Sequence, residues 1–236
     1  MNLKIFMVGP VALPNSCHDE CMHKLGRLIL FPMILGACAG PAAPRAPADP
    51  AHVEALLMQM IDQGMNRLGQ PNGFWNDPAV RIGLPEDLAR AEKSARRFGL
   101  ERPLEEWHAA LNHAAEAAMP AAKTLLRDMA AGCLATDAVP LARDGNDTVT
   151  RRVQVHCDAL LLERLRPIVV EAAQRQHLVA SYKRLVKRLS VLERGHEMPR
   201  LDLEAWLTHA VLNGMYTALA DEERRARRKK SSHSPK

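Results

Sequence analysis

The residues with the clearest capacity for chemistry lie on one predicted helix and in the loop before it. His113 and Glu116 are about one helical turn apart, so both can face a common site, which Arg81 from the loop could join. A base, an acid and a cation of this kind would suit a hydrolase or another enzyme of a small ligand. The sequence has no HExxH motif, nucleophile elbow or phosphate-binding glycine loop. We therefore predict that the chain has no catalytic residue, metal or cofactor. The alternative is an enzyme whose pocket lies near these three residues.

A second group of functional residue types lies in the loop of residues 69–85, which is rich in glycine and proline. Two aromatic side chains, an amide, an acid and a cation form the candidate binding loop: Phe74, Trp75, Asn76, Asp77 and Arg81. One interpretation is a rigid loop whose aromatic residues fill a helical core. The other is a surface that offers an aromatic face and polar groups to a partner.

Two of the five cysteines are Cys133, just after the end of one predicted helix, and Cys157, within another. They form either one disulfide or two buried thiols, and their spacing does not decide between these. No CxxC pair occurs, so neither a zinc ribbon nor a thioredoxin-like site is supported.

The residues that precede Cys38 resemble a bacterial lipoprotein signal. Lys24 and Arg27 supply positive charge, residues 28–37 form an apolar run, and Leu-Gly-Ala stands directly before the cysteine. The run is half of the roughly twenty residues that a membrane-spanning helix needs, and Pro32 interrupts it. We therefore expect a cleaved signal and lipidation of Cys38.

The composition along the chain suggests five segments. The prolines, cysteines and acidic groups before Met22 do not suit a signal peptide. We therefore hypothesise that translation begins at Met22. The predicted segments are a non-native extension over 1–21, a signal peptide over 22–37, a lipidated cysteine with a Pro/Ala tether over 38–50, a helical domain over 51–223 and a basic disordered tail over 224–236.

The C-terminal segment from Arg224 holds seven Lys or Arg residues and no acid, whereas residues 38–223 are mildly acidic. The run Arg224–Lys230 could contact anionic lipid, or it could be a solvated helix end. We expect no nucleic acid partner, because an exported protein meets little nucleic acid. The neighbouring acid pair Glu222 and Glu223 is expected to be solvated.

Helical punctuation and apolar spacing predict an all-α fold. We expect a single bundle of about seven helices, with disordered leader, tether and tail. The helices are predicted near residues 50–68, 85–98, 103–118, 120–131, 147–175, 179–192 and 203–218, with Pro120 separating the third from the fourth.

Several short motifs in order along the chain resemble the DUF4197 family, a domain of unknown function. They are Asn72-Gly73-Phe74, Val80–Pro85, Asn112–Ala118, Arg166–Val169, Tyr182–Val186, Asp202-Leu203, Asn213-Gly214 and Glu222-Glu223. The resemblance implies an exported, all-helical bacterial protein and lends no activity. The chain departs from the family pattern at its basic C-terminal end.

These observations predict a lipid-anchored cell-envelope protein that faces the periplasm and acts as a binding or interaction module for a protein or envelope component. Ala39 follows the predicted lipidated cysteine, where an acidic residue usually marks retention at the inner membrane. We therefore expect the outer membrane. The enzyme with a pocket near His113, Glu116 and Arg81 remains the alternative.

Overall fold

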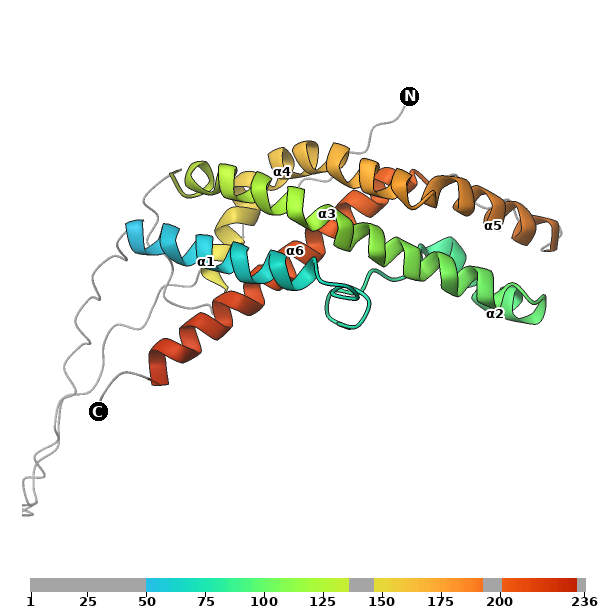
Figure 1. The fold of residues 1–236 in the computed structure, drawn as a ribbon, viewed down its shortest axis with the longest axis horizontal. Coiled ribbons are helices and arrows are strands. Elements are labelled where there is room, and N and C mark those ends of the chain that lie inside the picture. The colour runs from blue at the N-terminus through green and yellow to red at the C-terminus, as the bar shows by residue number, and fades with distance from the viewer. Residues whose placement is uncertain (1–49, 136–146, 193–200, 233–236) are drawn as a thin grey trace, which may run out of the picture. The chain divides into compact units, whose positions relative to one another are not determined.

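The computed structural model describes residues 50–135, 147–192 and 201–232, and within these ranges the chain forms α-helices and no strand (Figure 1). All of them belong to one compact unit, residues 45–236. The predicted all-α bundle is confirmed. The helices of the described residues are α1 (Pro50–Leu68), α2 (Glu86–Arg97), α3 (Glu101–Ala135), α4 (Thr148–Arg175), α5 (Leu178–Leu192) and α6 (Leu203–Ser232).

The long helix α3 is the centre of the packing. It contacts α1, α2, α4 and α5, and α6 packs against α1 and α4 (Figure 1). The inner face of α3 is rich in small residues, of which Ala114, Ala115, Ala118 and Ala122 are buried. Small side chains let helix axes approach closely, so the remaining core is built mostly from Leu, Val and Met.

The expected break at Pro120 is absent, and the third and fourth predicted helices are one continuous helix of 35 residues. A proline inside a helix costs about 3 kcal/mol. Here Pro120 is exposed, while Met119 and Ala122 on either side of it are buried. Burial of each large apolar side chain contributes about 1.5–3 kcal/mol, so the packing of both halves offsets the cost of the proline.

Helix α6 continues to Ser232, so residues 224–232, which we expected in a disordered tail, are helical. Glu222 and Glu223 are only 5% and 0% exposed, so the expectation of a solvated acid pair is wrong. The buried acids tie this part of α6 to neighbouring elements, and the helix therefore extends past them. Residues 233–236 lie outside the described ranges, as do residues 1–49, which hold the predicted extension, the signal, Cys38 and the tether except for Pro50, the first residue of α1.

The sulfur atoms of Cys133 and Cys157 are bonded to each other. The bond, here called the α3–α4 disulfide, joins the end of α3 to the first half of α4 across 24 residues of sequence. Both cysteines are buried, and the chain between the helices includes residues outside the described ranges.

Candidate functional site

One face of α3 holds the 69–85 loop, which connects α1 to α2. His108, Asn112 and Glu116 are spaced four residues apart, so they form a stripe along the helix. Each bonds to the backbone of the loop. This stripe explains why a helix otherwise rich in alanine carries polar residues on its packed face.

Glu116 binds the first half of the loop. Its Oε1 accepts hydrogen bonds from the backbone nitrogens of Phe74, at 3.1 Å, and Trp75, at 3.3 Å. Its Oε2 accepts one from the backbone nitrogen of Asn72 at 3.0 Å. Glu116 is 7% exposed, and its carboxylate takes the place of the backbone partners that the loop lacks. A carboxylate engaged in this way is not free to act as a general base.

Asn112 and His108 bind the second half of the loop at a single residue. The side-chain amide of Asn112 accepts from Ile82 N at 2.8 Å and donates to Ile82 O at 3.0 Å, as a neighbouring strand would. His108 Nε2 also donates to Ile82 O, at 2.8 Å. The backbone of Ile82 is therefore fixed against α3.

The turn at the start of the loop needs an unusual backbone. Asn72 has φ 63°, and asparagine tolerates this region better than most residues. A Cβ on Gly73 would lie 2.5 Å from the carbonyl oxygens of Arg67 and Leu68, so only glycine permits this approach to the end of α1. These two residues direct Phe74 into the core, where it is 0% exposed.

The candidate binding loop therefore divides into two sets. Phe74 is a core residue, and Asp77 is engaged, since its Oδ2 accepts from Arg67 Nη1 at 2.7 Å and its Oδ1 from Ala79 N at 3.0 Å. Trp75 is half-buried, whereas Asn76 and Arg81 are exposed. The interpretation of a rigid loop that fills the core holds for Phe74, whereas Trp75, Asn76 and Arg81 remain the candidate partner surface.

Arg81 is held by Trp75. Its Nε donates to the Trp75 carbonyl oxygen, and its guanidinium carbon lies 5.2 Å from the centre of the Trp75 ring. The ring in turn has an edge-on contact with His108 at 4.9 Å between centroids. The two terminal nitrogens of Arg81 make no hydrogen bond or ion pair with any other described residue. Arg81 thus presents a fixed, unoccupied donor edge that suits a carboxylate or phosphate.

An open groove of about 270 Å³ lies beside Arg81, between the loop and α6. We call it the loop–α6 groove. Its apolar lining comes from both walls, and Asn213 and Thr217 add polar groups. The lining residues are Ala79, Val80, Arg81, Ile82, Gly83 and Leu84 from the loop, with Trp206, Ala210, Asn213, Gly214 and Thr217 from α6.

The polar cluster proposed for the alternative enzyme is not assembled in this groove. Neither His113 nor Glu116 lines it. His113 Nε2 lies 3.3 Å from Asn72 Oδ1, so this histidine also contacts the loop. Across the described ranges, no group of three or more His, Cys, Asp or Glu residues is placed to hold a metal ion.

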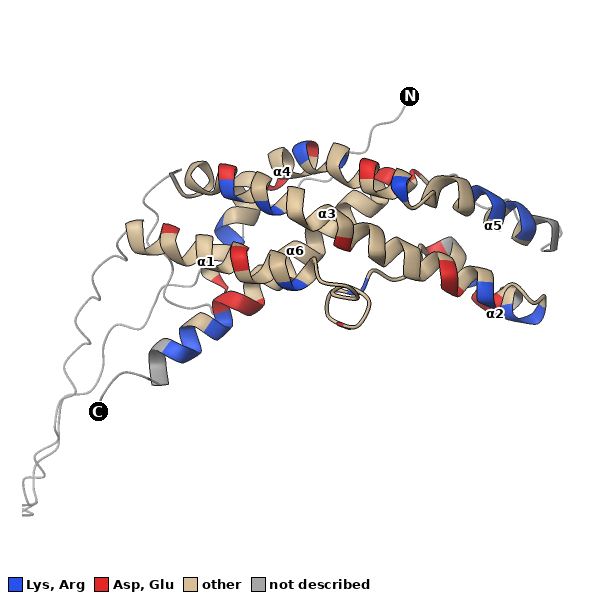
Figure 2. Cartoon of the chain, in the orientation of Figure 1, with Lys and Arg blue, Asp and Glu red and all other residues tan. Residues whose placement is uncertain are grey.

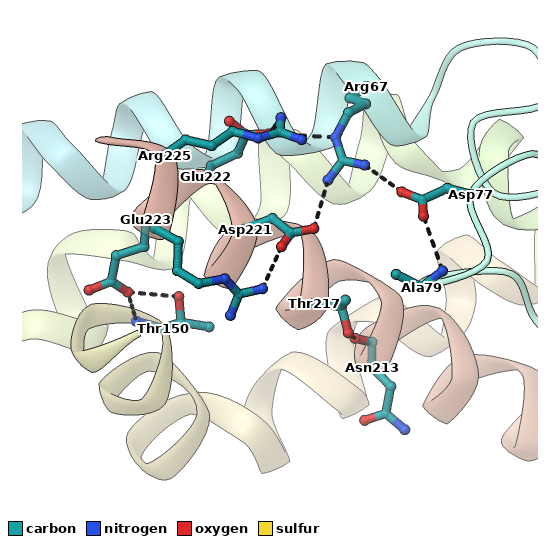
Figure 3. A network of polar contacts seen from close by, with 11 residues as sticks. Arg67, Asp77, Ala79, Thr150, Asn213, Thr217, Asp221, Glu222, Glu223 and Arg225 are labelled. Atoms are coloured by element: carbon teal, nitrogen blue, oxygen red, sulfur yellow. Dashed lines mark hydrogen bonds and ion pairs between the residues drawn. The ribbon is translucent and has the colours of Figure 1, made fainter. Parts of the chain in front are cut away.

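Arg67 connects the two walls of the groove (Figure 3). From α1 it pairs with Asp77 of the loop, and its other nitrogens lie 3.7 Å from Asp221 Oδ2 and 3.5 Å from Glu222 Oε1 of α6. Arg67 therefore attaches α6 to α1 through Asp221 and Glu222, and it attaches the loop through Asp77. No sequence pattern marks Arg67 for this role, because a basic residue is ordinary in the last turn of a helix.

Glu223 of α6 binds the first turn of α4. Its carboxylate accepts from the backbone nitrogens of Val149 and Thr150 and from the Thr150 hydroxyl, each at 3.0 Å (Figure 3). Asp147 stands at the N-cap position of α4 and makes no capping hydrogen bond with its side chain. Glu223 therefore caps α4 from another helix.

Comparison with known proteins gives a family and no function. A family model described as "Protein of unknown function (DUF4197)" matches residues 51–235, so the match includes the basic end of the chain. No curated protein and no solved structure matches the chain. In the described ranges, none of the helices has the length and apolar character needed to cross a membrane.

Proposed function

Since the chain belongs to the DUF4197 family, whose description names no activity, we propose from its own residues that it is a binding module of the bacterial cell envelope, lipid-anchored through Cys38. It faces the periplasm, with the outer membrane as the proposed site of attachment. Its partner is a protein or another envelope component that enters the loop–α6 groove.

The observation that carries this proposal is the unoccupied edge of Arg81 beside an apolar groove. Arg81 is exposed, and Trp75 fixes it through one backbone hydrogen bond and its ring, so that its two terminal nitrogens face away from the loop's own hydrogen bonds. Trp206 and Leu84 supply apolar surface next to it. A partner segment with an acidic group and a neighbouring apolar side chain fits this combination.

The α3–α4 disulfide supports export. Disulfides persist in oxidising compartments such as the periplasm and are rare in the cytosol. The bonded, buried Cys133 and Cys157 are therefore consistent with the signal expected before Cys38.

Photo-crosslinking in intact cells tests the groove. Asn213→p-benzoylphenylalanine places a reactive group in the groove, and Gln63→p-benzoylphenylalanine places the same group on an exposed position of α1 as a control. We expect an adduct from position 213 that is absent from position 63 and weakened by Arg81→Gln. Identical adducts from both positions, or an adduct that Arg81→Gln leaves unchanged, would contradict the proposal.

Metabolic labelling with palmitate tests the anchor separately. We expect label in the wild-type chain and none in Cys38→Ser, with the protein recovered from outer-membrane fractions. Equal labelling of both chains would refute lipidation at Cys38 without affecting the groove.

A further inference from the structure

The exposed face of α5 carries four cations. Lys183, Arg184, Lys187 and Arg188 are all exposed, and their spacing places them along one side of the helix. Figure 2 shows the Lys and Arg positions of α5 in blue. No acidic residue occurs anywhere in α5. We call these four residues the α5 basic face.

The opposite side of α5 fixes this face in place. Leu178, Tyr182, Leu185 and Leu189 are buried. Trp107 of α3 donates from its indole nitrogen to Leu178 O at 3.3 Å, and its ring centre lies 5.6 Å from that of Tyr182. The helix therefore cannot turn its cations toward the core, and all four are presented together.

The cations of α5 differ from those at the end of α6. Arg225 pairs with Glu222 at 2.8 Å and Arg227 with Glu223 at 2.5 Å, and Arg224 pairs with Asp221. These ion pairs occupy three cations of the C-terminal run, which we first considered as a contact for anionic lipid.

By contrast, Lys183, Arg184 and Arg188 make no ion pair or hydrogen bond with another described residue. Lys187 shares their face and their exposure. Among the described residues, three of the four cations of the α5 basic face are thus unpaired, whereas Arg224, Arg225 and Arg227 of the C-terminal run are paired.

We propose that the α5 basic face binds the phosphate groups of anionic phospholipids at a bilayer surface. A row of cations on a fixed helix matches a plane of phosphates, and Lys and Arg both donate to phosphate oxygens. The face carries no aromatic side chain on which nucleic acid bases could stack, which favours a membrane over single-stranded nucleic acid. This surface is additional to the loop–α6 groove, so the domain would contact the bilayer with α5 and a partner with the groove.

Each cation near an anionic surface strengthens binding about five-fold, so four cations together contribute on the order of several hundred-fold. Because the attraction is electrostatic, it falls steeply as salt concentration rises. Removal of the four charges should therefore reduce vesicle binding on the order of 100-fold or more at low salt.

The experiment measures vesicle binding of the full chain carrying Cys38→Ser, so that no acyl chain contributes. Vesicles of phosphatidylcholine alone give the baseline, and vesicles that also contain phosphatidylglycerol give the signal. The test variant replaces Lys183, Arg184, Lys187 and Arg188 with Gln. The matched control replaces Arg224, Arg225, Arg228 and Lys229 with Gln and so removes the same charge. Circular dichroism verifies that both variants are folded.

We expect preferential binding to the anionic vesicles that the α5 variant loses and the C-terminal variant retains within about three-fold. Equal losses in both variants would overturn the proposal, because the attraction would then follow net charge alone. Loss only in the C-terminal variant would move the contact to α6. Tighter binding to a DNA oligonucleotide than to the anionic vesicles, lost in the α5 variant, would overturn it in favour of nucleic acid. Failure of palmitate labelling would leave this test unaffected.

Discussion

Replacing Glu116 with alanine should release the 69–85 loop from α3. The carboxylate accepts three backbone hydrogen bonds, from Asn72, Phe74 and Trp75. Because α3 supplies this acceptor from more than 40 residues away, no local group can replace it. The polar contacts left to the loop would be those at Ile82, the contact of Asn72 with His113 and the ion pair of Asp77 with Arg67.

The size of the effect follows from the burial of the three donors. The hydrogen bond from the Phe74 nitrogen is buried, so losing this bond leaves an unsatisfied donor, which costs about 1–3 kcal/mol. The Asn72 and Trp75 bonds are only partly buried, so water replaces part of each. We therefore expect Glu116→Ala to lower the free energy of unfolding by about 3–4 kcal/mol. Glu116→Gln keeps the acceptor for Phe74 and Trp75 but turns a donor toward Asn72, and should cost about 1–2 kcal/mol.

Two measurements test this prediction. Urea unfolding followed by circular dichroism gives the change in free energy, and hydrogen exchange gives the opening of the loop amides. Glu106→Ala is the matched control, because Glu106 lies on the same helix, is exposed and has exposed Arg102 as its one ion-pair partner among the described residues. That change should stay within about 0.5 kcal/mol.

The reasoning would be refuted by a Glu116→Ala variant whose unfolding free energy differs from wild type by no more than that of Glu106→Ala. Unchanged exchange of the loop amides in the same variant would have the same meaning. Either result would show that the carboxylate does not hold the loop.

Three further predictions concern the frame of the site. Glu223→Ala uncaps α4 and leaves two buried backbone nitrogens without acceptors, so it should cost about 3–5 kcal/mol in urea unfolding. Reduction of the α3–α4 disulfide should lower the free energy of unfolding by about 3 kcal/mol, measured with and without a reductant. Gly214→Ala should destabilise the fold by about 1–3 kcal/mol, because its Cβ would lie 2.6 Å from the buried ring of Phe74. A Cβ at Gly132 meets nothing within 4 Å, so Gly132→Ala should stabilise α3 by up to about 1 kcal/mol. Thermal melts that rank the two glycine variants in the opposite order would contradict this account.

Much of the fold could be predicted from the sequence, because helix signals are local. Pro50 and Gly69 bracket α1, and the apolar spacing between them is regular. The signal failed at Pro120, where tertiary burial outweighs a local preference that points to a break. The local helix signal also failed after Glu223, where the basic composition indicated a solvated tail. In the structure Glu222 and Glu223 are buried, and α6 continues past them.

The sequence marked the 69–85 loop as a candidate site but did not separate its residues into roles. The loop stands out through its mixture of aromatic, amide and charged residues. Which of them serve the fold depends on partners in other helices, such as Asn112 of α3 for Ile82 and Arg67 of α1 for Asp77. No local pattern encodes those pairings, so Phe74 and Arg81 looked equally available although one is buried and the other exposed.

The charged residues of this domain divide into those that hold the fold and those that are available for binding. Glu116 and Glu223 each occupy a buried position where backbone nitrogens lack an acceptor, and each therefore acts as a structural anion. A substitution at either residue would impair binding by disturbing the fold, so loss of activity alone would not identify a contact residue. Arg81 and the α5 basic face are different, because Arg81 bonds to the loop itself, and Lys183, Arg184 and Arg188 make no ion pair or hydrogen bond with another described residue. Variants at these positions should leave the fold intact, and a change in binding there reports the contact itself.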